Sequence, residues 1–231
     1  MDTINANLQA VKARINAAAK QCGRDANSIE LLAVSKTFGT DAVRSAHAAG
    51  QRAFGENYVQ EGVEKITALS GLPLVWHFIG PIQSNKTRQI AENFDWVHSI
   101  DRLKIAERLA AARPAGRAPL EVCIQINIGD ETSKSGVAPA GALALAQAMA
   151  KLPQLRLRGL MTIPPASDDV AVQRRHFGEL RALRDSLAAS GCALDTLSMG
   201  MSADIEAAIA EGSTMVRVGT AIFGTRPRQT A

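Results

Sequence analysis

The lysine at position 36 directly follows an apolar run, Leu-Leu-Ala-Val, at residues 31–34. Such a run is typical of a buried strand, so the side chain of Lys36 would start where that strand ends. A lysine partly removed from water has a lowered pKa, and its neutral amine can attack a carbonyl carbon. The alternative is a lysine whose stem lies along the protein while its ammonium group reaches water. Position alone favours neither interpretation.

Two later segments have the composition of anion-binding loops. Residues 198–204 read Ser-Met-Gly-Met-Ser-Ala-Asp, with Ser202 where the N-cap of a following helix is expected. Residues 217–224 read Arg-Val-Gly-Thr-Ala-Ile-Phe-Gly, in which Gly219 lets the backbone approach a ligand and Thr220 offers a hydroxyl. Free N–H groups at a helix N-terminus favour a phosphate. Ordinary capping and turn chemistry would explain either loop by itself.

The elements that position these residues follow from hydrophobic periodicity. Apolar residues at 4, 8, 11 and 15 predict an N-terminal helix that ends at Gly23. Short strand-like runs then alternate with helical segments. We expect strands at 31–34, 53–55, 75–79, 96–100, 120–128, 157–163, 194–199 and 215–218. We expect helices at 41–49, 56–69, 85–93, 101–112 (with Asp101 as its cap), 140–152, 168–190 and 203–210.

Strands that alternate with helices require a parallel sheet, because each helix carries the chain back over the sheet. Eight such units predict an α/β fold, a single (β/α)8 TIM-type barrel with an extra N-terminal helix, in one domain spanning residues 1–231. The alternative is an open doubly wound sheet, but the GxGxxG motif of its dinucleotide-binding members is absent.

A closed barrel brings the three segments together. Its active site lies at the carboxyl ends of the strands, and phosphate commonly binds between the loops after strands 7 and 8. Strand 1 is the neighbour of strand 8, so Lys36 would lie beside both loops. An aldehyde that carries a phosphate would span the lysine and the loops. Pyridoxal 5′-phosphate (PLP) fits that description better than a sugar phosphate, which position alone does not exclude.

The composition indicates which kinds of partner, metal site and cellular compartment are not expected. The net charge is +4 and the basic residues are scattered, so a nucleic-acid partner is not expected. The three cysteines, Cys22, Cys123 and Cys192, have no metal-binding spacing and indicate a reducing compartment. Neither a signal peptide nor a membrane span is recognisable. We expect a cytoplasmic protein without a metal site, and a monomer.

The whole chain resembles the PLP homeostasis protein family, whose barrel is similar to the N-terminal domain of alanine racemases. The matching stretches are LLAVSKT (31–37), FGENYVQE (54–61), WHFIGPIQSNK (76–86), SKSG (133–136), GLMTI (159–163), LSMGMSADIEAAI (197–209) and STMVRVGTAIFG (213–224). They fall at nearly every expected strand end.

The resemblance implies a role for each matching residue. Lys36 would form the Schiff base with PLP, and Arg217 would face the pyridine nitrogen. Ser202, Gly219 and Thr220 would lie near the phosphate. Around the ring or the phosphate we expect Asn57, Met161, Ser198 and Met199. A cation beside the pyridine nitrogen keeps that nitrogen unprotonated, which makes the ring a poor electron sink. The alternative for Arg217 is a salt bridge within the barrel.

Other polar residues receive plainer interpretations. His77 is expected to be a hydrogen-bonded core histidine, and His98 a strand-end residue. Lys134 could reach an anion at the barrel mouth, although a solvated loop lysine is the simpler expectation. Glu56 would orient Asn57 or cap a helix.

The resemblance implies a PLP carrier in intracellular vitamin B6 and amino-acid homeostasis, with PLP and apo-PLP enzymes as its partners. The alternative is an amino-acid racemase of the alanine racemase type. Those enzymes take their second base, a tyrosine, from a separate domain of the partner subunit. This sequence ends at Ala231 and its single tyrosine is Tyr58. We therefore expect binding without classical turnover.

Overall fold

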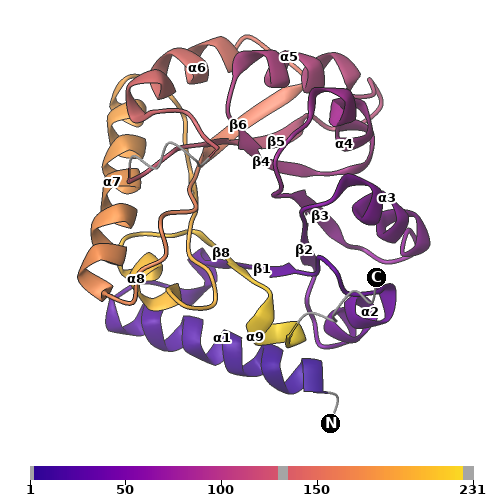
Figure 1. The fold of residues 1–231 in the computed structure, drawn as a ribbon, viewed down its shortest axis with the longest axis vertical. Helices are drawn as coiled ribbons and strands as arrows, with labels where there is room; N and C mark the ends of the chain where they lie inside the picture. The colour runs from indigo at the N-terminus through magenta and orange to yellow at the C-terminus, as the bar shows by residue number, and fades with distance from the viewer. Residues whose placement is uncertain (1–2, 130–134, 226–231) are drawn as a thin grey trace.

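The computed structural model describes residues 3–129 and 135–225 as a closed barrel of eight parallel strands (Figure 1). The strands are β1 (Glu30–Val34), β2 (Ala53–Glu56), β3 (Val75–Phe78), β4 (Trp96–Ile100), β5 (Leu120–Gln125), β6 (Leu155–Met161), β7 (Thr196–Ser198) and β8 (Met215–Val218). Each strand pairs with the next in the chain, and β8 closes the ring on β1, with Leu32 opposite Arg217. The predicted (β/α)8 fold is confirmed.

Helices surround the strands on the outside of the ring (Figure 1). They are α2 (Thr40–Ala48), α3 (Val59–Ala68), α4 (Thr87–Asn93), α5 (Leu103–Ala112), α6 (Ala142–Met149), α7 (Val170–Ala189), α8 (Ile205–Ala210) and α9 (Thr220–Phe223). Three short 3₁₀ turns cover Ala26–Ser28, Ser84–Lys86 and Pro139–Gly141. The strands are buried between these helices and the barrel interior, which explains why most of them read as continuous apolar runs.

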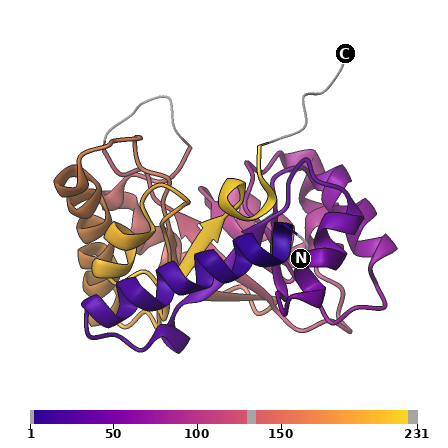
Figure 2. The same ribbon diagram turned by 90° about the horizontal axis from the view of Figure 1, so that it is seen from below.

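The extra N-terminal helix, α1 (Thr3–Gln21), runs along the outside of the barrel (Figure 2). Leu8, Val11 and Ile15 form its buried face, as their spacing predicts. The helix packs against α8, α9 and α2, so it lies beside the elements that follow β7 and β8. The chain turns away at Gly23, whose φ of 66° is the left-handed conformation that glycine adopts without strain.

Three local expectations are wrong, while the other element boundaries shift by only a few residues. Glu56 ends β2 instead of starting a helix, because its side chain turns into a buried ionic cluster. Asp101 does not cap α5: the N-cap position is Arg102, and the Asp101 carboxylate pairs with that arginine instead. The N-cap position of α8 is Asp204 instead of Ser202, since the helix starts only at Ile205.

Candidate functional site

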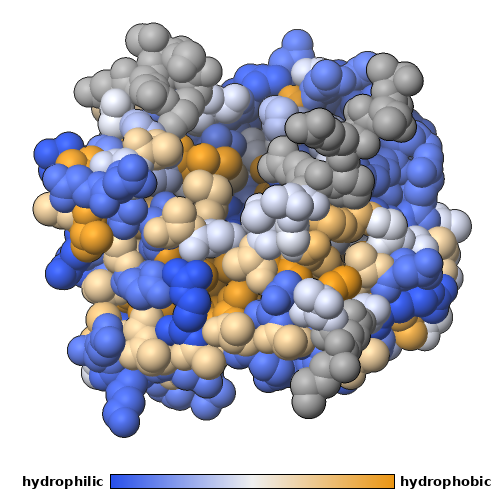
Figure 3. All heavy atoms as spheres, turned by 60° about the horizontal axis from the view of Figure 1, so that its bottom comes forward, coloured by the Kyte–Doolittle hydropathy of each residue, from blue (hydrophilic) through white to orange (hydrophobic). Residues whose placement is uncertain are grey.

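A cavity of about 270 Å³ opens where the carboxyl ends of the strands meet. Small-molecule sites typically enclose about 300–1,000 Å³, so this cavity is at the small end of that range. We call it the mouth pocket. It is lined by Val34, Lys36, Asn57, Ile79, Ile163, Met201, Ser202, Ala203, Arg217, Gly219 and Thr220. Figure 3 shows apolar and weakly polar side chains gathered in the middle of a face of the molecule, with hydrophilic side chains around them.

Six of the nine predicted site residues line the mouth pocket: Lys36, Asn57, Ser202, Arg217, Gly219 and Thr220. They come from the ends of β1, β2, β7 and β8, although they are far apart in the sequence. The other three, Met161, Ser198 and Met199, are fully buried and do not line the pocket. Their position around a cofactor stays a prediction.

Five apolar lining residues are absent from the sequence-based set: Val34, Ile79, Ile163, Met201 and Ala203. Ile79 follows β3, Ile163 follows β6, and Met201 lies in the loop after β7. Ile163 and Met201 are also among the few large hydrophobic side chains that are exposed. Their position just beyond a strand end was the available signal, because the loops after the strands build the site in this fold.

Arg217 is buried in the barrel and points from β8 toward its neighbours on β6 and β7. Its Nη1 donates to the Ser198 carbonyl oxygen at 2.6 Å and to Ser198 Oγ at 2.8 Å, and its Nη2 donates to the Thr162 carbonyl oxygen at 2.8 Å. Within the described ranges it forms no ion pair, which argues against the salt-bridge interpretation. Burial lowers the pKa of the guanidinium to about 10, so it stays charged at neutral pH.

Two histidines continue this network into the barrel. His98 Nδ1 lies 2.8 Å from Ser198 Oγ, and His77 Nδ1 lies 3.0 Å from His98 Nε2. Burial lowers the pKa of His77 to about 3 and that of His98 well below its usual value, so both rings are neutral at pH 7. The expectation for His77 is confirmed, whereas His98 lies within β4 and not at a strand end.

Only the bond from the arginine has a fixed direction. A guanidinium can only donate, so Ser198 Oγ accepts from Arg217. In the Ser198–His98 and His98–His77 bonds, the tautomer of each neutral histidine sets which atom donates. We call Ser198, His98 and His77 the histidine column. The column adds no negative charge, so among the described residues Arg217 has no anionic hydrogen-bond partner, although the Asp204 carboxylate attracts it electrostatically.

The loop after β8 passes close to β1, whereas the loop after β7 is held by a bond within itself. A Cβ atom on Gly219 would lie only 3.1 Å from the Val34 carbonyl oxygen, so a side chain there would crowd β1. In the loop after β7, Asp204 Oδ1 accepts from the Met201 N–H at 2.5 Å. Both loops contribute residues to the pocket wall, and their role in binding a phosphate stays a prediction.

Helix α1 braces the same two loops from outside the barrel. Arg14 Nη1 donates to the Ser202 carbonyl oxygen at 3.2 Å, while its other nitrogens bind the Glu206 carboxylate. Asn7 Nδ2 donates to the Ile222 carbonyl oxygen at 3.0 Å. The extra helix therefore contacts the backbone of each predicted phosphate loop.

The mouth pocket also contains a buried polar atom with unused bonding capacity. Asn57 Oδ1 is shielded from solvent and has no hydrogen-bond partner among the described residues. A buried acceptor left in this way is costly, so it is commonly satisfied by a ligand or an ordered water. Lysine, guanidinium, hydroxyls and this amide together suit a phosphorylated aldehyde with a heteroaromatic ring.

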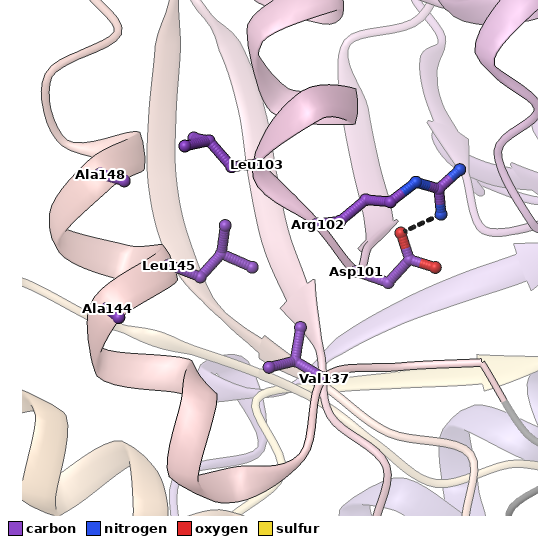
Figure 4. Close-up of a pocket in the computed structure, with 7 residues that line it drawn as sticks. All are labelled: Asp101, Arg102, Leu103, Val137, Ala144, Leu145 and Ala148. Carbon is purple, nitrogen blue, oxygen red and sulfur yellow. Dashed lines mark hydrogen bonds and ion pairs between the residues drawn. The ribbon is translucent and has the colours of Figure 1, made fainter.

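A second cavity, of about 280 Å³, differs from the mouth pocket in its lining (Figure 4). It lies between α5 and α6, and its walls are mostly the alkyl side chains of Leu103, Val137 and Leu145. The single ion pair there, Asp101 with Arg102, is largely exposed at the edge. None of the predicted site residues lies in this cavity.

Metal clusters and membrane spans can be assessed only in the part of the chain that the structure describes. Among those residues no cluster of histidine, cysteine, aspartate or glutamate could hold a metal ion. No helix within them has the length and apolar character that crossing a membrane needs. Lys134 lies outside the described residues.

Comparison with known proteins places this geometry in a family. Residues 6–227 match the family described as alanine racemase, N-terminal domain. A pyridoxal phosphate homeostasis protein of Pseudomonas aeruginosa is 59% identical over 226 residues, which cover 98% of this chain and 97% of that protein. The protein of the same name from Escherichia coli strain K12 is 55% identical over 229 residues, with 98% of each chain covered.

A solved structure agrees with these relatives. PipY of Synechococcus elongatus, with PLP bound, superposes with a TM-score of 0.79 and 40% sequence identity, over 91% of this chain and 100% of that one. The likeness extends over both the fold and the sequence. The chain belongs to the pyridoxal phosphate homeostasis protein family, built on the alanine racemase N-terminal domain.

Proposed function

We propose that this protein binds PLP in the mouth pocket as a Schiff base on Lys36. The observation that carries the proposal is the convergence of Lys36, Arg217 and the two loops around Ser202 and Gly219 on one small cavity. A relative with 40% sequence identity was solved with PLP bound, which supports the same ligand here.

Each side chain would hold one part of the ligand. The neutral amine of Lys36 attacks the aldehyde carbon, a C=N bond forms, and the aldehyde oxygen leaves as water. Hydroxyls of Ser202 and Thr220, with backbone N–H groups near Gly219, would bind the phosphate. Arg217 would face the pyridine nitrogen and Asn57 would contact the ring, with Met161, Ser198 and Met199 behind them.

Bound PLP supplies an electron sink for carbanions formed on an amino acid. The positive charge of Arg217 would keep the pyridine nitrogen unprotonated and so weaken that sink. We therefore propose a carrier that retains and releases PLP in vitamin B6 and amino-acid homeostasis, with apo-PLP enzymes as acceptors. We further propose that residues 1–231 act as one domain, as a cytoplasmic monomer without a nucleic-acid partner.

The racemase alternative needs a proton acceptor on each face of the substrate. Lys36 could serve one face. Tyr58, the single tyrosine, is 57% exposed and does not line the mouth pocket. No other feature of the described pocket favours a second base, so binding without classical turnover is the better supported function.

The test is chemical trapping on a named residue. Protein mixed with PLP should turn yellow, and borohydride should add the reduced cofactor mass to the peptide that contains Lys36. Lys36→Ala should lose both signals, because no other amine lines the described pocket. An unchanged absorbance band in Lys36→Ala would overturn the assignment.

Turnover is checked on the same samples. Loaded protein incubated with L-alanine should racemise it no faster than free PLP at equal concentration. Fast, saturable conversion that is lost in Lys36→Ala would favour the racemase alternative.

A further inference from the structure

Three charged side chains lie beneath the loop that carries Lys36, outside the mouth pocket. Lys65 and Glu61 lie on α3, four residues apart and so on one face of the helix, and Glu56 ends β2. Lys65 and Glu56 are almost completely buried, with side-chain exposures of 5% and 0%. Lys65 Nζ lies 2.8 Å from Glu56 Oε1 and 2.6 Å from Glu61 Oε1. We call these three residues the lysine clamp.

The lysine clamp grips the residue on each side of Lys36. Before it, Lys65 Nζ donates to the Ser35 carbonyl oxygen at 2.8 Å, and Ser35 Oγ donates to Glu56 Oε1 at 2.6 Å. After it, the Thr37 N–H donates to Glu61 Oε1 at 2.6 Å. The backbone entering and leaving Lys36 is therefore fixed by charged groups from two other elements.

The grip coincides with a strained backbone. Thr37 has a φ of 69°, and it is the only non-glycine residue with positive φ in the described part of the chain. A β-branched residue rarely adopts this conformation, which costs about 1–3 kcal/mol and persists only where the surroundings impose it. The hydrogen bond from Thr37 to Glu61 is a local interaction that imposes it.

Stability alone gives a poor reason for such a cluster. A buried ion pair often contributes no more than well-packed apolar side chains of the same volume, because both charges lose their hydration. Burial raises the pKa of Glu56, against the opposing effect of Lys65, which shows that the carboxylate is held at a cost. A requirement for precise backbone geometry at Lys36 accounts for that cost.

We propose that Lys65, Glu56 and Glu61 are positioning residues that aim the Lys36 amine at the aldehyde carbon of PLP. The inference rests on the proposed function, in which Lys36 forms the Schiff base. None of the three side chains lines the pocket, so they would act mainly on the covalent step and not on recognition of the ring and phosphate.

Two ligands can separate the covalent step from recognition of the ring and phosphate. PLP can form the C=N bond with Lys36 and release water, whereas pyridoxamine 5′-phosphate has the same ring and phosphate but an amine in place of the aldehyde. A displaced Lys36 side chain should weaken the binding of PLP alone. A generally distorted pocket should weaken the binding of both ligands.

The experiment uses Glu61→Ala, which removes the acceptor of the Thr37 N–H at a partly exposed position. We expect PLP to bind about tenfold more weakly and its absorbance band to form about tenfold more slowly, because small misplacements of a reacting group are expensive. Pyridoxamine 5′-phosphate affinity should be unchanged. Glu61→Gln, which keeps an oxygen acceptor, should recover most of the rate.

The matched control is Glu64→Ala, which removes an exposed glutamate on the same helix that accepts a hydrogen bond from Gln60. It should bind both ligands as the parent protein does. Equal losses for both ligands in Glu61→Ala, or no loss for either, would overturn the clamp. If the parent protein forms no borohydride-trapped adduct on Lys36, the proposed function itself fails, which is a separate result.

Discussion

Two buried cations lie near the mouth pocket, Lys65 between α3 and the strands and Arg217 inside the barrel, and their surroundings differ. In the lysine clamp, the ammonium group of Lys65 lies between the carboxylates of Glu56 and Glu61. Beneath the pocket on the other side, the guanidinium of Arg217 meets only carbonyl oxygens and the hydroxyl of Ser198. Lys65 is paired directly with carboxylates, whereas Arg217 has no direct anionic partner among the described residues.

The difference teaches where each charge acts. The groups of the lysine clamp bond directly to the backbone on both sides of Lys36, so the lysine clamp works through geometry. Arg217 lines the mouth pocket without a direct anionic partner among the described residues, so its charge acts on what the pocket holds. The histidine column supports this second arrangement, because neutral rings accept and pass on hydrogen bonds without adding a negative charge.

The largest effect should come from removing the cation of the lysine clamp. Lys65→Met keeps the length of the side chain but leaves Glu56 buried without a positive partner. We expect a loss of about 3–5 kcal/mol in the free energy of unfolding, measured by urea denaturation at pH 7.5. Adding Glu56→Gln to the same protein should recover much of that loss, since a neutral amide needs no cation.

The contrast between Lys65 and Arg217 would be contradicted if the free energy of unfolding of Lys65→Met stayed within about 1 kcal/mol of that of the parent protein. A loss of that size is typical of an exposed ion pair. The charge of Lys65 would then be screened by solvent, and the lysine clamp would not be a buried ionic cluster. An additive double variant would have the same meaning, because coupled charges give non-additive energies.

A smaller effect should appear when the histidine column is titrated. The folded-state pKa of His77 is about 3, below the value near 6.5 of an unfolded chain, so the folded protein binds fewer protons between these two values. The stability that His77 contributes is complete above about pH 6.5 and is lost progressively as the pH falls. At pH 5 the loss from this ring should be about 2 kcal/mol.

The measurement compares urea denaturation at pH 7.5 and pH 5 for the parent protein and for His77→Gln. The amide of glutamine can accept from His98 Nε2 or donate to it, but it does not titrate. We expect its stability to fall by about 2 kcal/mol less than that of the parent over this interval. Identical losses in the two proteins would mean that the column is hydrated in solution and that its rings are not held neutral.

The sequence predicted the parts of this comparison that depend on local pattern. Lys36 was found because it ends an apolar run, and Arg217 and Gly219 because they lie where a strand meets a glycine-containing turn. The barrel itself followed from the alternation of strands and helices. In each case the signal lies within a few neighbouring residues.

The supporting networks were missed because their partners come from distant elements. Lys65 reads as a surface lysine until α3 packs it against β1 and β2, although its spacing of three from the buried Gly62 was a signal. His98 received the wrong assignment, since nothing near it in the sequence indicates a partner one hundred residues away on β7. Ser202 was wrong as a cap because α8 begins later than the loop composition suggests.

The smallest effect concerns Ser198, the contact between the histidine column and Arg217. Ser198→Ala removes the shared hydroxyl but leaves the bond from Arg217 Nη1 to the Ser198 carbonyl oxygen. We expect a loss of about 1 kcal/mol in the free energy of unfolding. Ser99→Ala is the matched control, because it also removes a buried hydroxyl, one that donates to the Gly80 carbonyl oxygen, without touching Arg217.

The two serine variants should therefore lose similar free energy of unfolding. They should differ in how strongly the ring nitrogen of bound PLP is protonated. With PLP labelled with ¹⁵N in its ring, the chemical shift of the nitrogen reports its protonation between pH 6 and pH 9. The parent protein and Ser99→Ala should give the same shift, while Ser198→Ala should move toward the protonated value, since a looser guanidinium repels that proton less strongly. If all three proteins give one shift, the histidine column only fills the core, and the carbonyl contacts of Arg217 are enough to hold its charge toward the pocket.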